Sequence, residues 1–141
     1  MIEIINRQRS KPINAKQLRE LSEQALQTIG SSKQAATVVF VSDAAIRKLN
    51  KQFRGQDQVT DVLSFPHEAE RFEAENQLQL GEVVIGVGRA AAQAKQNGLT
   101  FSNEVEQLIL HGLLHLCGYD HETDDGEMNR LEVKLRKKLG I

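Results

Sequence analysis

Three of the four histidines in the chain lie within eleven residues, in the segment HGLLHLCGYDH from His111 to His121. On an α-helix of about 3.6 residues per turn, His111 and His115 lie one turn apart on the same face, where both rings can reach one ion. Gly118 allows the chain to leave the helix in a left-handed conformation, and the turn after it can bring back His121. The spacing HxxxHxxGxxH therefore predicts a metal site formed by His111, His115 and His121.

The expected ligand set indicates both the metal and the type of reaction. Three neutral imidazoles leave a tetrahedral zinc ion with one open position, which is the arrangement of a catalytic zinc site rather than a structural one. Zinc lowers the pKa of a water molecule in that position to about 7, so a nucleophile forms at neutral pH. We therefore expect one zinc ion per chain and a hydrolytic reaction. Nickel, copper and iron also bind to three histidines, so the physiological metal stays open.

The metzincin peptidases have the same histidine spacing, with a general-base glutamate directly after the first histidine. The corresponding residue of this chain is Gly112, which has no side chain to accept a proton. Loss of a general base typically costs a factor of about 10²–10⁴ in rate. A zinc peptidase is therefore an alternative that depends on spacing alone, and Gly112 weakens it.

A second group of polar residues lies between Arg54 and Phe65, in the segment RGQDQVTDVLSF. The planar guanidinium of Arg54 matches two phosphate oxygens at once and can stabilise the negative charge that develops on a phosphate group during its cleavage. Arg54 is therefore the candidate catalytic arginine. Arg47, Lys48 and Lys51 precede it on the same expected helix and are candidates for RNA binding. The alternative for these three residues is a solvated helix face.

The hydrophobic periodicity predicts the order βαβαββααα. The expected strands are 2–5, 37–41, 61–65 and 78–88, and the expected helices are 15–29, 43–54, 89–96, 102–116 and a last helix that is capped by Asp124 and runs to about residue 139. Ile46, Leu49 and Phe53 form the apolar stripe that we expect the helix at 43–54 to bury. Strands separated by helices favour parallel pairing, whereas the last two strands follow each other and favour antiparallel pairing. We expect one α+β domain over residues 1–141, with a mixed sheet of about four strands covered by about five helices.

Composition narrows the range of functions. The 141 residues carry a formal net charge of -1, which argues against a protein that coats nucleic acid through bulk positive charge, so any RNA contact must be local. No segment approaches the roughly 20 apolar residues of a membrane span, so no membrane partner is expected. The N-terminus lacks the pattern of a signal peptide, and a single cysteine cannot form an internal disulfide. We therefore expect a cytoplasmic protein.

The two motifs together resemble the YbeY family of single-domain endoribonucleases. TDVLSF at residues 60–65 and HGLLHLCGYDH at residues 111–121 match the signature patterns of that family in the same order. The resemblance implies zinc bound by His111, His115 and His121, and places Arg54 at the position of the family arginine associated with activity. One departure is Glu82, where many members have aspartate.

The resemblance also implies a substrate and a cellular role. It indicates a single-strand-specific, metal-dependent endoribonuclease that acts in maturation of the 16S rRNA 3′ end and in ribosome quality control. The expected partners are then RNA, especially small-subunit rRNA, and the ribosome, with no DNA partner. A second hypothesis is a ribosome-assembly factor whose zinc is mainly structural and whose basic helix docks on rRNA. The sequence does not identify a general acid or base.

Overall fold

The structure is a computed structural model that describes residues 1–67, 79–120 and 122–141. Its elements follow the order expected from the sequence: β1 (Ile2–Asn6), α1 (Ala15–Ile29), β2 (Ala35–Val41), α2 (Asp43–Arg54), β3 (Val62–Pro66), β4 (Gln79–Gly86), α3 (Val87–Gln96), α4 (Phe101–Leu116) and α5 (Glu127–Leu139). The prediction of an α+β fold is confirmed. In the described part of the chain, no helix is both long and apolar enough to cross a membrane.

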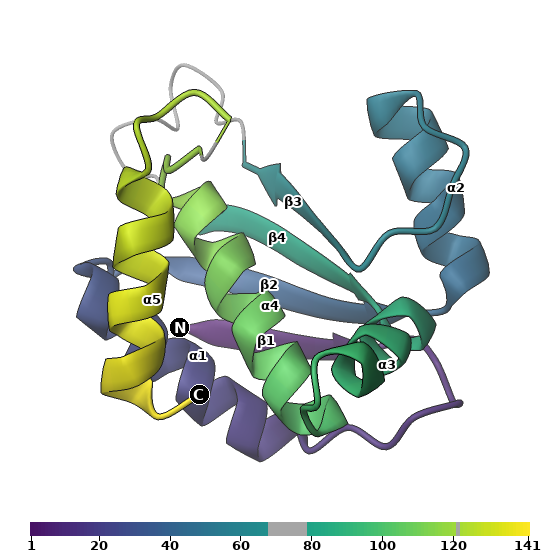
Figure 1. Cartoon of the computed structure of the whole chain (residues 1–141), viewed down its shortest axis with the longest axis horizontal. Coiled ribbons are helices and arrows are strands. Elements are labelled where there is room, and N and C mark those ends of the chain that lie inside the picture. Colours follow the sequence, from purple (N-terminus) through teal and green to yellow (C-terminus); the bar gives the residue numbers. More distant parts are fainter. Residues whose placement is uncertain (68–78, 121) are drawn as a thin grey trace.

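The four strands form one mixed sheet in the order β1-β2-β4-β3 (Figure 1). β1 pairs with β2 and β2 pairs with β4 in parallel, whereas β3 pairs with β4 in the antiparallel sense. This is the pairing expected from the order of the elements, because α1 separates β1 from β2, α2 and β3 separate β2 from β4, and β3 and β4 follow each other among the described elements. For the residues that the structure describes, the prediction of a mixed four-stranded sheet with five helices is therefore confirmed.

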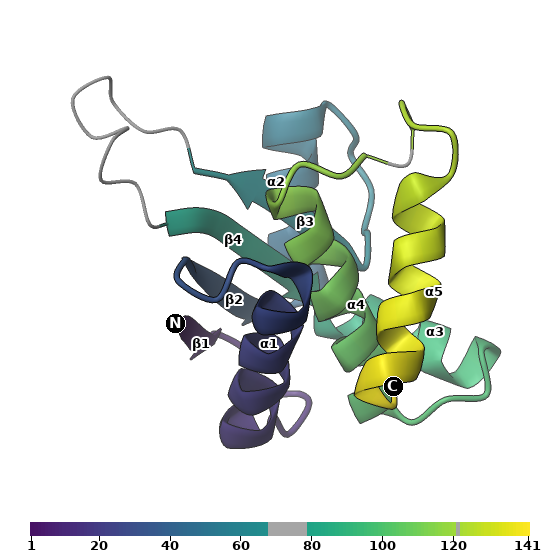
Figure 2. The same cartoon turned by 90° about the vertical axis from the view of Figure 1, so that its left-hand side faces the viewer.

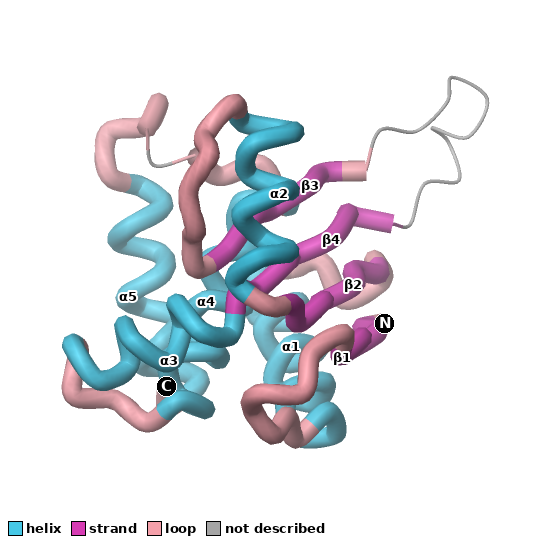
Figure 3. The backbone as a smooth tube through the Cα atoms, turned by 90° about the vertical axis from the view of Figure 1, so that its right-hand side faces the viewer, coloured by secondary structure: helices cyan, strands magenta, loops and turns pink. Residues whose placement is uncertain are grey.

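The two faces of the sheet carry separate hydrophobic cores. On β2, Val38 and Phe40 point into the larger core, and Val39 and Val41 point into the smaller one, as the alternation of strand side chains requires. Helices α1, α4 and α5 lie on the side of the larger core (Figures 1 and 2). Helix α2 packs on the opposite side (Figure 3). Its Ile46 side chain is fully buried in the smaller core.

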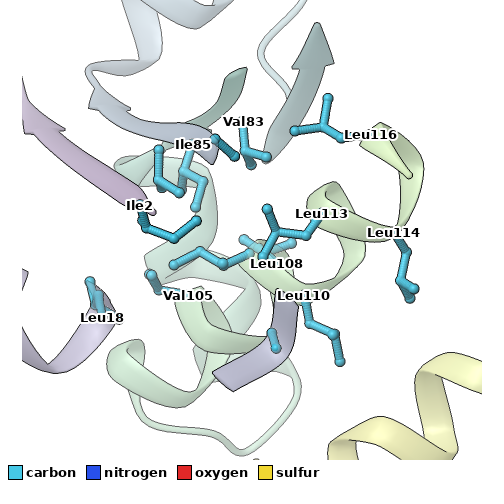
Figure 4. Close-up of a cluster of buried hydrophobic side chains, with 14 of the residues drawn as sticks. Ile2, Leu18, Val83, Ile85, Val105, Leu108, Leu110, Leu113, Leu114 and Leu116 are labelled. Atoms are coloured by element: carbon cyan, nitrogen blue, oxygen red, sulfur yellow. The ribbon is translucent and has the colours of Figure 1, made fainter. Parts of the chain in front are cut away.

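Helix α4 occupies the centre of the larger core (Figure 4). It begins after Thr100, whose hydroxyl accepts a hydrogen bond from the backbone N–H of Asn103 at 3.1 Å. Val105, Ile109 and Leu113 are almost completely buried, because the helix is apolar on nearly every face and is surrounded by α1, α3, α5 and the sheet. The helix that carries His111 and His115 is therefore held firmly in the fold.

Two local predictions from the sequence were wrong. Phe53 was expected to pack inward with Ile46 and Leu49, but 58% of it is exposed, because it lies in the last turn of α2, at the edge strand β3. Asp124 was expected to be the N-cap of helix α5, but the helix begins at Glu127, with Gly126 in the N-cap position. The Asp124 carboxylate still supports that start, because it accepts hydrogen bonds from the backbone N–H groups of Gly126 and Met128.

Candidate functional site

A groove of about 1240 Å³ lies beside α4. The residues that line it come from the C-terminal end of α2, from β3, α3, α4 and α5, and from the turn after α4. Arg54, Asp61, His111, His115 and Glu132 are among the residues that line it. The groove thus joins the two segments that the sequence singled out, although they are more than 40 residues apart.

Helix α4 places the rings of His111 and His115 together in this groove. Their centroids are 4.8 Å apart and their planes are inclined by 80°. The proximity follows from the one-turn spacing of the two residues on α4. His121, the third predicted ligand, lies outside the described residues, and among those that are described no group of three or more His, Cys, Asp or Glu is placed to hold a metal.

A carboxylate from α5 contacts the first of these rings. Nδ1 of His111 lies 2.8 Å from Oε1 of Glu132, whose side chain is only 8% exposed. Arg136, one turn further along α5, places Nη2 3.7 Å from the same oxygen. Burial opposes ionisation of Glu132, but the hydrogen bond with His111 and the nearby positive charges outweigh it, so its pKa lies below the ordinary value.

Glu132 was missed in the sequence analysis, although a signal was present. It lies between Met128 and Leu135 on the buried stripe of α5, where an apolar residue would be expected. A carboxylate in such a position requires a buried partner. That signal indicates a partner but does not identify it, because His111 is 21 residues away in the sequence.

Gly112 faces the sheet. A Cβ atom at this position would lie 2.6 Å from Cγ1 of Val83 and 3.2 Å from the Ser64 hydroxyl. The Ser64 hydroxyl also donates a hydrogen bond to the Gly112 carbonyl, at 3.3 Å, so α4 rests closely on β3 and β4. A glutamate at position 112 would displace the helix, which gives a physical reason for glycine where metzincins have their general base.

We expect the substitution Gly112→Ala to destabilise the protein by about 1–3 kcal/mol, the usual cost of overpacking a close contact. Urea denaturation followed by circular dichroism measures this loss. In the background of Val83→Ala, which removes the two methyl groups nearest to the new Cβ, the cost of G112A should be much smaller. Additive effects of the two substitutions would show that the contact with Val83 is not the cause.

The four basic residues of α2 occupy different surroundings. Arg54 is the last residue of the helix, before Gly55 in the left-handed conformation, and it lines the groove. Arg47, Lys48 and Lys51 are not among the residues that line the groove. Nε of Arg47 and Nζ of Lys51 lie 2.8 Å and 3.8 Å from the Asp57 carboxylate. The structure therefore brings Arg54, but not the other three, into the groove with the histidines.

The polar residues of the TDVLSF segment help to hold the groove together. Asp61 accepts a hydrogen bond from the backbone N–H of Val62 at 2.8 Å, and Ser64 joins β3 to α4 as described above. The Gln93 amide donates to Asp61 at 2.9 Å and to Glu104 at 3.2 Å. Glu104, which is only 4% exposed, also accepts from the Asn97 amide. No local pattern in the sequence indicates this network, which joins Asp61, directly before β3, to α3 and α4.

Phe53 forms part of the groove wall next to Arg54. Its ring meets that of Phe65 edge to face, with centroids 5.1 Å apart. Glu82, the departure noted in the sequence, lies on β4 and lines a different hollow together with Val39 and Val84. The lining of the groove therefore includes an exposed aromatic ring, an arginine and two histidines.

Comparisons with known proteins establish the family. This chain, a small α+β protein with a histidine-lined groove, matches the family model described as Endoribonuclease YbeY over residues 3–140. The chain is 37% identical to the Endoribonuclease YbeY of Geobacter metallireducens over 141 residues, which cover 99% of this chain and 94% of that protein. It is 44% identical to that of Helicobacter pylori over 108 residues, 77% of this chain and 74% of the relative.

A solved structure supports the same relationship. A Thermotoga maritima protein known from its solution structure is 32% identical and superposes with a TM-score of 0.63, covering 99% of this chain and 89% of the other. The chain belongs to the YbeY endoribonuclease family. This confirms the resemblance drawn from the two motifs, and it supports the predicted endoribonuclease role.

Proposed function

We propose that this protein is a zinc-dependent endoribonuclease that cleaves single-stranded RNA in the groove between α2 and α4. The observation that carries the proposal is the placement of Arg54, His111 and His115 in one groove of a chain from an endoribonuclease family. The activity class follows from the family. The metal, the preference for single strands and the roles of the individual residues are our proposals.

The donors in the groove suit a zinc ion. His111 and His115 offer two imidazoles from one helix face, and His121 would supply the third. Imidazole is a common zinc ligand, and metal-binding histidines usually have a carboxylate or carbonyl on the second ring nitrogen, which is the place of Glu132 beside His111. A zinc ion with an open position would supply Lewis acidity and a nucleophile at neutral pH.

Arg54 would bind the phosphate that is cleaved. Its guanidinium lines the groove, and among the described residues none forms an ion pair or a side-chain hydrogen bond with it. It can therefore offer its donors to two phosphate oxygens and stabilise the charge that develops on them.

Phe53 would favour binding of single-stranded RNA over double-stranded RNA. Its exposed ring lies next to Arg54 on the groove wall, and aromatic rings of this kind stack with unpaired bases. In a duplex the bases are already stacked on one another and present no free face. Arg47, Lys48 and Lys51 lie on α2 outside the groove and would bind RNA that extends beyond it.

The cellular role that we propose is maturation of the 16S rRNA 3′ end and ribosome quality control in the cytoplasm. The support for this role is the family membership. Small-subunit rRNA and the ribosome would then be the partners.

Removal of the metal tests the proposed function. We expect protein dialysed against a chelator to lose cleavage of a labelled single-stranded RNA, and one equivalent of zinc to restore it. A duplex of the same sequence should be cut much more slowly by the zinc-loaded protein. Full cleavage by protein shown to be metal-free would contradict the proposal, and cleavage of a peptide substrate instead of RNA would favour the peptidase alternative.

A further inference from the structure

We propose that Glu132 is a positioning residue that presents Nε2 of His111 to the metal. The inference rests on the proposed function in one respect, which is that His111 binds a metal ion. It adds a role for α5, the helix that carries Glu132 but none of the three predicted ligands.

The hydrogen bond between the two side chains fixes which ring nitrogen carries the proton. An ionised carboxylate can only accept, so the 2.8 Å contact with Glu132 requires a proton on Nδ1 of His111. In the neutral ring the lone pair is then on Nε2. Without the carboxylate the ring could adopt the other tautomer or rotate, and both changes reduce the fraction of protein that is ready to bind a metal.

Glu132 is itself held in place. Its side chain is 8% exposed, and the neighbouring residues on the inner face of α5, Met128 and Leu135, are buried in the core. Arg136 approaches the same carboxylate oxygen from the next turn, 3.7 Å away. The chain of contacts therefore runs from Arg136 through Glu132 to His111, and packing of α5 sets the position of the ring.

The size of the effect can be estimated from other metal sites. Loss of a partner that supports a metal ligand typically weakens metal affinity by about 10–100-fold. A buried carboxylate with no connection to the metal would change the stability of the fold but not its affinity for zinc. Metal affinity therefore separates a positioning role from a purely structural one.

The test compares Glu132→Gln with Glu106→Gln. Glu106 is a matched control because it is a buried carboxylate on α4 that accepts a hydrogen bond from Ser102, and it is not among the residues that line the groove. Zinc affinity, measured by competition with a chromophoric chelator, should fall about 10–100-fold in E132Q and stay near the wild-type value in E106Q. Arg136→Gln should give a smaller loss than E132Q.

A second measurement needs no variant and no metal. Nitrogen-15 NMR of the imidazole rings in the metal-free wild type should show the neutral His111 ring protonated on Nδ1. Protonation on Nε2, or an unchanged zinc affinity in a folded E132Q, would overturn the proposal for Glu132 while leaving zinc-dependent cleavage intact. If the Nδ1 tautomer is present and the wild type binds no zinc, the proposed function fails instead.

Discussion

Replacement of His115 by alanine should remove zinc binding and RNA cleavage and leave the fold in place. The substitution takes away one of three expected ligands, and its effect should exceed the roughly 100-fold loss of affinity caused by removing a residue that merely supports a ligand. His115 lies on the groove side of α4 and is only partly buried, so its loss should cost little stability. Metal analysis and a cleavage assay on the same preparation measure both effects.

His67 supplies the matched control. It is an exposed histidine at the end of β3, and it lines the hollow that contains Glu82 rather than the groove. H67A should therefore bind one zinc ion and cleave RNA at nearly the wild-type rate. Wild-type cleavage by an H115A protein shown to contain no zinc would contradict the assignment of this histidine to the catalytic metal site.

The second large effect is expected for Arg54→Gln, which should lower kcat by about 10²–10³-fold. Removal of one donor that stabilises a developing negative charge typically has an effect of this size. The neutral amide keeps much of the length and polarity of the arginine but loses its charge and its planar pair of donors. Zinc content should be unchanged, because no ligand is removed. Single-turnover cleavage with saturating enzyme measures the chemical step.

Arg47→Gln controls for net charge. It removes the same charge from the same helix, but Arg47 pairs with Asp57 and does not line the groove. We expect R47Q to weaken RNA binding at most modestly and to leave kcat unchanged. Equal losses of kcat in R47Q and R54Q would show that Arg54 acts only through the general electrostatic field of α2.

Much of the fold follows from patterns that are local in the sequence. Asn14 and Ser42 are residue types that commonly cap helices, and each side chain accepts a backbone hydrogen bond at the start of its helix, α1 and α2 respectively. The apolar run in β2 is buried on both faces. Phe53 was placed wrongly because periodicity indicates which face of a helix is apolar but not how far the sheet beneath it extends.

The candidate site was predicted only in part, because local sequence patterns do not determine how one element packs against another. The spacing of His111 and His115 on one helix determines their proximity, so the sequence was sufficient for that pair. The contact of His111 with Glu132 depends instead on how α5 packs against α4, and no local pattern encodes it. The convergence of His121 on the same point stays a prediction from the motif.

The central claim is that His111, His115 and His121 hold one zinc ion in the groove and leave a coordination position open. A crystal structure of the zinc-loaded protein, with the ion located by anomalous scattering, tests it most directly. We predict one ion per chain, three imidazole nitrogens at about 2.0–2.1 Å and no protein side chain in the fourth position. An ion bound elsewhere, or a fourth position filled by a protein ligand, would contradict the account.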